Sequence, residues 1–474
     1  MGIGWAADGM SIRPSADDDM RETRARRRWI LGCASPSNAT RDGDATPAID
    51  TGTNVRAMST EGSASTAPNG FDPHRAIRDL RTLAERTGGP DGSRRLCWTP
   101  EWVEARTLLR EELATLPVQV EQDEAGNLWA YLRGQSDEVV AVGSHLDSVP
   151  AGGWLDGALG VMAGLEVLRS LVSAPELPKR SFALVDWADE EGARFSRSLF
   201  GSGAVAGTLD LDILRELKDC WGNALPDVVG EHGVSLDTID GARTRLENMV
   251  AYLEIHIEQG PVLEQHGLGI ATVTGSVGIE RERLIFRGQA AHAGTMPMGM
   301  RRDSLRAMSR FALELAEIGA RHQGVTTVGS VTCRPGVVTA VPGETVCTMD
   351  MRHIDAGELA AMFAEARAAA TSAADAEGCT VELEHIFRIP PVPFDPVLVD
   401  IVRRAVEAAE GHHFEMPSGA LHDASEMGRV VPTAMVFTSS IAGLSHTKEE
   451  DTPDDHLAMG ITAFHQAVLD TINL

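Results

Sequence analysis

The feature that most constrains the fold is a strand–loop–helix–strand series in which polar residues follow each strand. The uncharged run Val139–Val142 leads into Gly143-Ser144-His145, and after a glycine-rich loop the stretch Leu159–Leu171 has apolar residues at helical spacing. A second apolar run, Phe182–Val185, is followed by Asp189-Glu190-Glu191. Open α/β sheets are built from such units and form their sites at the carboxyl ends of parallel strands. The sequence therefore predicts an α/β domain with a site at these strand ends.

A second pattern, between about residues 276 and 388, indicates a separate unit inserted in this domain. Its stretches follow the order β-α-β-β-α-β, which predicts a ferredoxin-like α+β unit. The strands are expected at 283–286, 326–331, 345–351 and 380–383, and the helices at 303–320 and 358–374. The larger domain is expected at 71–275 and 389–474, on either side of the unit at 276–388. Residues 1–70 lack apolar periodicity and are expected to form a disordered tail.

Charge and cysteine content narrow the classes of function. Lys and Arg total 42 against 69 Asp and Glu, and the net charge of −27 disfavours binding to nucleic-acid phosphates or anionic membranes. No apolar stretch approaches the ~18 residues that indicate a membrane span. The 6 cysteines form no C-x-x-C pair, which argues against a disulfide framework or a thiolate zinc site and favours a reducing compartment. We therefore expect a cytoplasmic protein that binds neither nucleic acid nor membrane.

Five polar residues at the strand ends share one chemistry, because their nitrogen and oxygen donors suit divalent zinc, manganese, cobalt or nickel. They are His145, Asp156, Glu190, Glu191 and His256. Asp147, two residues after His145, is expected to hold the imidazole by its other nitrogen. Taken singly, each residue has a plainer interpretation, since a lone histidine is usually a satisfied core or surface residue and an adjacent Glu-Glu pair is usually solvated. The single residues alone leave both interpretations open.

A series of motifs in a fixed order adds the context that single residues lack. The motifs are Gly143-Ser144-His145-Leu146-Asp147, Gly152-Gly153-Trp154-Leu155-Asp156-Gly157, Asp189-Glu190-Glu191, His256-Ile257-Glu258-Gln259-Gly260, Ala291-His292-Ala293-Gly294, Asp350-Met351-Arg352, Ser418-Gly419-Ala420-Leu421-His422-Asp423 and Gly443-Leu444-Ser445-His446. With them, the chain from about Phe71 to its end resembles the M20-type amidohydrolases. The resemblance is to the branch of N-carbamoyl-L-amino acid hydrolases, β-ureidopropionases and allantoate amidohydrolases, and His256, where peptidase relatives usually carry an acidic ligand, favours this branch.

This resemblance implies an α/β, metallopeptidase-like catalytic domain with an inserted α+β lid and dimerisation domain, which closes over substrate. It also implies two divalent metal ions per subunit, zinc, manganese, cobalt or nickel. Their ligands would be His145, Asp156, Glu191, His256 and His446, with Asp156 bridging the two ions. Glu190 would be the general base that takes a proton from water and delivers it to the leaving nitrogen.

The resemblance further implies a homodimer and a set of substrate contacts. His292 matches a histidine that a neighbouring subunit presents to the site. Arg352 matches a residue that binds a substrate carboxylate, for which a guanidinium is well shaped. Gln259 and the backbone around Gly419 and Ala420 would complete the pocket.

Two departures from the family pattern leave the substrate open. Thr339 stands where asparagine is typical, and Leu421 stands where glycine is usual. Because threonine lacks the NH₂ donor of asparagine, a contact to substrate carboxylate or oxyanion is lost or replaced by water. Leu421 is expected to narrow the pocket.

The expected reaction is cleavage of the C–N bond of an N-carbamoyl L-amino acid or a β-ureido acid, a small carboxylate-bearing substrate. The products would be the amino acid, ammonia and carbon dioxide. Allantoate amidohydrolysis is the main alternative, and an aminoacylase or dipeptidase is a more distant one. A non-catalytic binding protein on the same scaffold is disfavoured, because no ligand or base position is missing.

Overall fold

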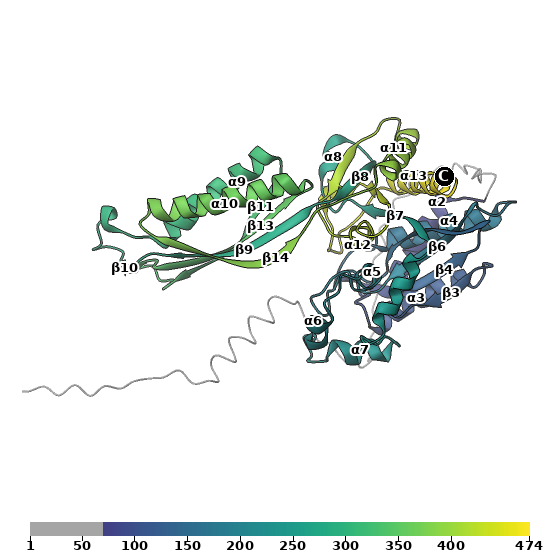
Figure 1. Cartoon of the computed structure of the whole chain (residues 1–474), viewed down its shortest axis with the longest axis horizontal. Coiled ribbons are helices and arrows are strands. Elements are labelled where there is room, and N and C mark those ends of the chain that lie inside the picture. Colours follow the sequence, from purple (N-terminus) through teal and green to yellow (C-terminus); the bar gives the residue numbers. More distant parts are fainter. Residues whose placement is uncertain (1–69) are drawn as a thin grey trace, which may run out of the picture.

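The computed structural model describes residues 70–474, which form a larger body and a smaller, elongated body that projects from it (Figure 1). The expectation of a disordered tail concerns residues 1–70 and, apart from Gly70, lies outside the described residues. The α/β fold class predicted from the sequence is confirmed. The exact domain boundaries, and the roles of lid and dimerisation domain, stay predictions.

The larger body is built on a nine-stranded mixed sheet. Its strands run in the order β15-β8-β17-β7-β5-β6-β4-β3, with β16 beside β8. Their bounds are β3 (Gln119–Gln122), β4 (Leu128–Leu132), β5 (Ser136–His145), β6 (Arg180–Trp187), β7 (Met249–Ile257), β8 (Ile270–Ser276), β15 (Val392–Pro393), β16 (Glu415–Ser418) and β17 (Thr433–Thr438). The central strands β17, β7, β5 and β6 are mutually parallel. Their carboxyl ends therefore meet at one edge, as the polar residues after each run predicted.

Helices cover both faces of this sheet, which explains why its central strands are mostly apolar on both sides. On β5, Val140 and Val142 belong to one hydrophobic cluster while Ala141 belongs to the other. One cluster includes α2 (Pro73–Thr87), α4 (Ala158–Ser173), α11 (Pro396–Glu410) and α13 (Asp454–Ile472). The opposite cluster includes α5 (Phe200–Ala206), α7 (Leu225–Glu231), η1 (Ile239–Leu246) and α12 (Asp423–Met427). The remaining elements of this body are β1 (Gly88–Gly89), β2 (Gly92–Ser93), α3 (Pro100–Leu113), α6 (Leu211–Glu216), α8 (Val262–His266) and η3 (Ile441–Gly443).

The smaller body has its own antiparallel sheet of four strands, in the order β11-β13-β9-β14. These strands are β9 (Gly278–Arg287), β11 (Val325–Arg334), β13 (Glu344–His353) and β14 (Thr380–Ile389). Two helices, α9 (Ser304–His322) and α10 (Ala356–Ala376), pack on one face and enclose a separate hydrophobic core. Short elements β10 (Ala291–His292), η2 (Met298–Met300) and β12 (Ala340–Val341) complete it. The long elements follow the β-α-β-β-α-β order that the sequence predicted.

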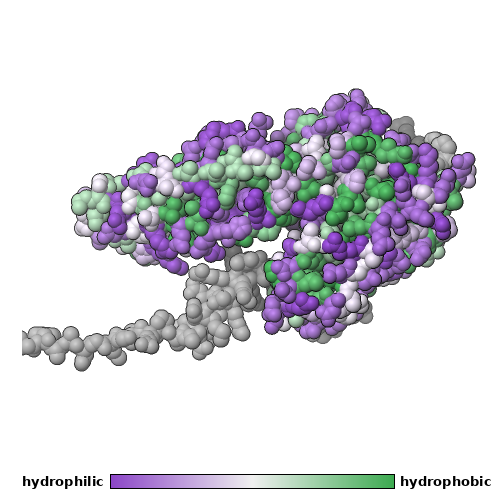
Figure 2. Space-filling model, in the orientation of Figure 1, coloured by the Kyte–Doolittle hydropathy of each residue, from purple (hydrophilic) through white to green (hydrophobic). Residues whose placement is uncertain are grey.

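The visible surface is mostly hydrophilic, with small hydrophobic patches on the larger body (Figure 2). Within residues 70–474 no helix combines the length and the apolar character needed to cross a lipid bilayer. The cytoplasmic location expected from the cysteine pattern stays a prediction.

A buried histidine links α13 to the start of the described chain. The His465 ring stacks on Phe71 with 3.9 Å between ring centroids, and its Nε2 lies 2.9 Å from Ser170 Oγ. Burial lowers the pKa of His465 to about 4. An unfolded histidine titrates near 6.5, so the unfolded chain takes up this proton first as the pH falls. The contribution of the neutral His465 to the free energy of unfolding is therefore complete above pH 6.5, and it is lost as the pH falls towards 4.

The direction of this pKa shift can be tested by substituting His465. The His465→Phe variant has no proton to gain, so between pH 7.5 and pH 5 it should lose about 2 kcal/mol less free energy of unfolding than the wild-type protein. Urea denaturation at the two pH values measures both losses, and any packing cost that does not depend on pH cancels in the comparison. Equal losses in the two proteins would contradict a buried, neutral His465.

Candidate metal centre and active site

Parallel strand ends bring the predicted ligands together. His145 is the last residue of β5, His256 lies near the end of β7, and Glu190 and Glu191 follow β6. Asp156 comes from the loop before α4. Gly157, at a φ of 65°, is the N-cap residue of α4, and an added Cβ there would lie 2.4 Å from the His145 ring, so only glycine allows this approach.

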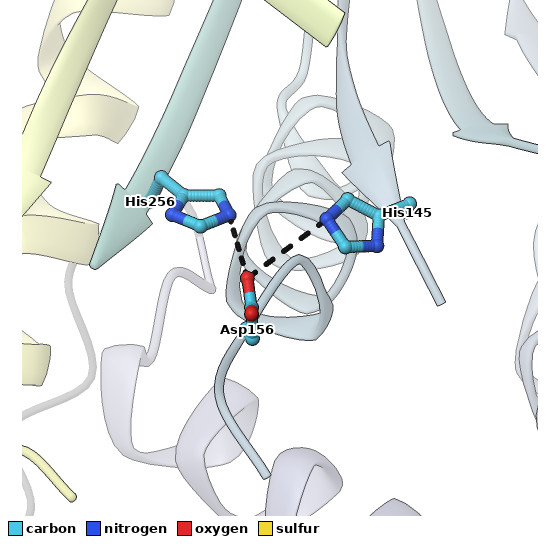
Figure 3. A group of neighbouring side chains, drawn as sticks. All are labelled: His145, Asp156 and His256. Carbon is cyan, nitrogen blue, oxygen red and sulfur yellow. Dashed lines mark ion pairs between the residues drawn. The ribbon is translucent and has the colours of Figure 1, made fainter. Parts of the chain in front are cut away.

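Asp156 lies at the centre of the group (Figure 3). Its Oδ1 is 3.1 Å from His256 Nε2 and 4.0 Å from His145 Nε2. Its Oδ2 is 3.1 Å from His446 Nε2, which in turn lies 3.5 Å from Glu191 Oε2. One carboxylate thus turns a different oxygen towards each of two sets of donors.

Backbone carbonyls orient both buried histidines. His256 Nδ1 donates to Ile257 O at 2.9 Å, and His145 Nδ1 donates to Asp147 O at 3.1 Å. Each ring therefore points Nε2 towards Asp156, which is the arrangement seen when the second nitrogen of a ligating histidine is held by the protein.

The expected role of Asp147 needs a correction. Its carboxylate lies 3.6 Å from His145 Nδ1, beyond hydrogen-bond distance, and it is the backbone carbonyl that holds the ring. The carboxylate instead accepts hydrogen bonds from the backbone N–H groups of Glu190 and Glu191, both at 3.2 Å. Asp147 therefore positions the two acidic residues as well as the histidine.

The centre concentrates buried negative charge. Burial, and then the charges of Asp423 and Glu191, raise the pKa of Glu190 well above its ordinary value. Burial, and then the charge of Asp156, do the same to the pKa of Glu191. At Asp156 the opposing effect of burial is outweighed by hydrogen bonds from the two histidines, His256 first, and its pKa lies well below the usual value. So many carboxylates are stable together only with compensating positive charge.

The donor set fits divalent cations that accept imidazole and carboxylate ligands. Two groups have donor atoms that all lie within 4.8 Å of one another and share one residue. They are His145, Asp156 and His256, and Asp156, Glu191 and His446. These are the five ligands that the family resemblance implied, and four of them are among the five strand-end residues whose chemistry suggested a metal site.

Two residues beside this centre were missed as site residues. His422 follows the segment Ser418–Leu421, and its ring lies 4.4 Å from the His256 ring, centroid to centroid. Glu254 is buried two residues before His256 and accepts from Ser144 Oγ at 2.7 Å. Together with His256 they form a further group of donors within 4.8 Å. A carboxylate inside an otherwise uncharged strand was the signal for Glu254.

A fully buried arginine also lies near the acidic groups. Arg95 Nε donates to Leu146 O at 2.7 Å and Nη1 donates to Ser93 Oγ at 2.8 Å, while Nη2 has no partner among the described residues. Burial lowers the pKa of Arg95, against the charges of Asp156 and Glu450, which raise it. Arg95 thus supplies part of the compensating charge. No sequence pattern indicated this role for Arg95, because its neighbours in the chain look like an exposed loop.

Glu450 ties two ligand loops together. Its Oε1 accepts from the backbone N–H groups of Leu155 and Asp156, both at 3.0 Å, and its Oε2 accepts from Ser445 Oγ at 2.8 Å. The loops that carry Asp156 and His446 are therefore held by one carboxylate. The φ of 56° at His446 shows that its backbone is held in a conformation that non-glycine residues rarely adopt.

A cavity of about 500 Å³ opens over this centre and is lined by both bodies. From the larger body, Gln259 Nε2 donates to Asp156 Oδ2 at 3.2 Å and Ala420 forms part of the wall. From the smaller body, Arg352 Nε donates to Asp350 Oδ1 and Nη1 donates to Gly419 O, both at 2.8 Å. Leu421 also lines the cavity, where the sequence expected it to narrow the pocket.

Two of the expected substrate residues are not in this cavity. His292 lies in β10 and Thr339 immediately precedes β12, with which β10 pairs. Ala293 N donates to Thr339 O at 2.8 Å, so the two residues are neighbours. Figure 1 shows β10 at the end of the smaller body farthest from the larger one. Within one chain, therefore, neither residue reaches the candidate metal centre.

Fold and site together define an α/β domain whose parallel strand ends carry a candidate metal centre with a shared carboxylate, and an inserted α+β body lies over it. The chain belongs to the Peptidase family M20/M25/M40, whose family model matches residues 141–470. This confirms the resemblance found in the sequence motifs.

Similar proteins cover nearly the whole described chain. An N-carbamoyl-L-amino-acid amidohydrolase from Paenarthrobacter aurescens is 34% identical over 395 residues, which are 81% of this chain and 95% of the relative. An allantoate amidohydrolase from Escherichia coli is 35% identical over 375 residues, 78% of this chain and 90% of the relative. A hydantoinase/carbamoylase family amidase from Burkholderia multivorans has a solved structure with a TM-score of 0.78, at 34% identity, covering 84% of this chain and 98% of its own.

Proposed function

We propose that this protein is a dinuclear metal-dependent amidohydrolase that cleaves the C–N bond of N-carbamoyl-L-amino acids or β-ureido acids. The observation that carries the proposal is that Asp156 is shared by two groups of donors, with Glu190 beside them and Arg352 lining the same cavity. The named activities of the relatives from P. aurescens and E. coli support a linear ureide as the substrate.

Two divalent ions, of zinc, manganese, cobalt or nickel, would be held by His145, Asp156 and His256 and by Asp156, Glu191 and His446. Such ions lower the pKa of bound water from 15.7 to about 7 and polarise a carbonyl oxygen. The protein contributes the fixed geometry, since carbonyl-held imidazoles and the Glu450 hydrogen bonds restrict the ligands before any substrate binds.

Glu190 is the general base of the proposed reaction. Its Oε2 lies 3.6 Å from His145 Nε2 and its side chain lines the cavity. The hydrogen bond from its backbone N–H to Asp147 holds the residue in place. Glu190 would take a proton from the attacking water and pass it to the leaving nitrogen, which departs as ammonia.

Arg352 binds the substrate carboxylate in this proposal. The bonds to Asp350 and Gly419 O hold its guanidinium at the cavity wall, and a guanidinium matches the planar carboxylate. Gln259 and Ala420 line the same cavity, and Gly419 contributes the carbonyl oxygen that accepts from Arg352.

Allantoate is the second candidate substrate, because the chain is 35% identical to an allantoate amidohydrolase and 34% identical to a carbamoyl amino acid amidohydrolase. Acyl-amino acids and dipeptides are more distant candidates. All of these substrates place a carboxylate near a hydrolysable C–N bond.

The first test is ammonia release by the manganese-supplemented protein from N-carbamoyl-L-methionine, N-carbamoyl-D-methionine, N-carbamoyl-β-alanine and allantoate. We expect hydrolysis of at least one L-carbamoyl or ureido substrate. Prior removal of metal with a chelator should abolish it and manganese should restore it.

The matched control is Glu190→Gln, which keeps the shape of the side chain but removes the base. General base catalysis contributes typically ~10²- to 10⁴-fold, so this variant should lose at least about 100-fold in kcat. Full activity of Glu190→Gln, or no ammonia from any of the four compounds with metal bound, would overturn the assignment.

We also propose that the protein acts as a homodimer in which His292 and Thr339 of one subunit reach the cavity of the other. Both lie at the far end of the smaller body, too remote to serve their own centre (Figure 1). His292 would stabilise the oxyanion that forms during hydrolysis. Closure of the smaller body over substrate would bring this second set of residues into place.

Subunit mixing tests this arrangement. Glu190→Gln and His292→Ala homodimers should each be strongly impaired, whereas a hybrid dimer contains one site with both native residues. Random exchange makes half of the dimers hybrids with one complete site of two, so mixing should restore about a quarter of wild-type activity. If His292 acted within its own chain, the mixture would show only the mean of the two variants.

A further inference from the structure

The loop that follows β10 at the far end of the smaller body is held by Arg301, which lies outside the motifs that define the candidate site (Figure 1). Residues 293–300 join β10 to this arginine, and none of them is buried. Met298 and Met300 leave 61% and 69% of their surface exposed. Because these residues bury little apolar surface, hydrogen bonds rather than packing must fix the conformation of the loop.

Arg301 links the end of this loop to its start. Its Nη2 donates to Ala293 O at 2.6 Å, and its Nε donates to Met296 O at 3.1 Å. Met296 N in turn donates to His292 O at 3.2 Å, which closes one turn of chain directly after the histidine. A guanidinium carries several donors in one fixed plane and can therefore bind two carbonyl oxygens at once. One side chain thus holds both ends of the turn that follows His292.

The same turn fixes the ring of His292. Its Nδ1 accepts from Gly294 N at 3.1 Å and from Thr295 N at 3.3 Å. A backbone N–H can only donate, so Nδ1 carries no proton and the neutral ring carries its proton on Nε2. The metal-ligand candidates His145 and His256 have the opposite arrangement, because their Nδ1 donates and their Nε2 offers a lone pair. His292 is therefore oriented as a hydrogen-bond donor, which suits an oxyanion, and not as a metal ligand.

We propose that Arg301 is a positioning residue that holds His292 as an Nε2–H donor for the active site of the partner subunit. This inference rests on the proposed function, in which His292 of one subunit stabilises the oxyanion in the cavity of the other. Loss of the guanidinium leaves the carbonyls of Ala293 and Met296 without this donor and frees the turn that orients the ring. Because oxyanion stabilisation depends on donors that are fixed in advance, the histidine then loses most of its effect although its own side chain is unchanged.

Steady-state kinetics of Arg301→Met, on whichever ureido substrate the wild-type protein hydrolyses, test this role. Removal of one oxyanion donor typically costs ~10²- to 10³-fold in kcat, so a misplaced donor should lower kcat at least about tenfold. KM should stay within about threefold, because Arg352, which binds the substrate carboxylate, is unchanged. The matched control is Arg302→Met, which alters the next residue, an exposed arginine, and should leave both constants unchanged.

A double variant separates action through His292 from an independent role. If Arg301 works only by orienting the histidine, adding Arg301→Met to His292→Ala should change kcat by less than about twofold. Independent contributions would multiply instead, and that result overturns the inference. Arg301→Lys keeps the positive charge but not the planar fork that spans two carbonyls, so it should resemble Arg301→Met. Full activity of Arg301→Lys would show that charge alone is needed and would equally overturn the inference.

Subunit mixing shows at which of the two cavities Arg301 acts. Arg301→Met impairs the His292 of its own chain, which serves the partner. Mixed with Glu190→Gln, it should therefore recover about a quarter of wild-type activity, as His292→Ala does. Mixed with His292→Ala, it should stay at the mean of the two variants, because no hybrid site is complete. Recovery in this second mixture would mean that Arg301 acts at the cavity of its own chain, and the inference would be wrong.

Hydrogen exchange tests the loop without relying on the reaction. The amides of Gly294, Thr295 and Met296 donate within the loop. Mass spectrometry should show that they exchange at least about tenfold faster in Arg301→Met than in the wild-type protein, with no change in Arg302→Met. Unchanged exchange in Arg301→Met overturns the inference even if activity falls.

These measurements also distinguish failure of the inference from failure of the proposed function. If the wild-type protein hydrolyses no ureido substrate, the proposed reaction fails, and hydrogen exchange still decides whether Arg301 fixes the loop. If Glu190→Gln complements neither His292→Ala nor Arg301→Met, the homodimer proposal fails, and the double variant still decides whether Arg301 acts through His292.

Discussion

Buried negative charge around Asp156 is the constraint on which the rest of the site depends. Burial and mutual repulsion raise the pKa values of Glu190, Glu191 and Asp147, and a fold that gathers such groups must supply positive charge. Arg95 supplies part of it from a fully buried position. Two histidines donate to opposite oxygens of Asp156, which is where a pair of divalent ions would share one ligand.

The parallel strands provide the geometry that this crowding requires. Because β5, β6 and β7 end at one edge, residues far apart in the chain converge without long side chains having to reach. The loops are then fixed by hydrogen bonds: Asp147 holds the backbone of Glu190 and Glu191, and Glu450 holds that of Asp156. The smaller body closes the opposite side of the cavity with a positively charged wall, so charge is separated across the substrate space.

Much of this centre could be predicted from the sequence because its ligands sit in short motifs, most of them at or just after the ends of apolar strands. His145, Asp156, Glu191, His256 and His446 all meet where expected. The residues that the sequence did not reveal act through register or tertiary contacts. Arg281 alternates with Glu280 and Glu282 as in any solvated strand, and only the pairing with Asp350 places it at the cavity. Arg95 and Glu450 come from segments that look like exposed loops. Thr339 was expected in the pocket but lies beside His292, because β10 and β12 pair at the far end of the smaller body.

The central claim is that two metal ions share Asp156, and anomalous diffraction from crystals of the manganese-loaded protein tests it most directly. The account predicts two anomalous peaks per chain. One should lie among His145, Asp156 and His256, and the other among Asp156, Glu191 and His446. A single peak, or a peak within Glu254, His256 and His422 with Asp156 free of metal, would contradict the account.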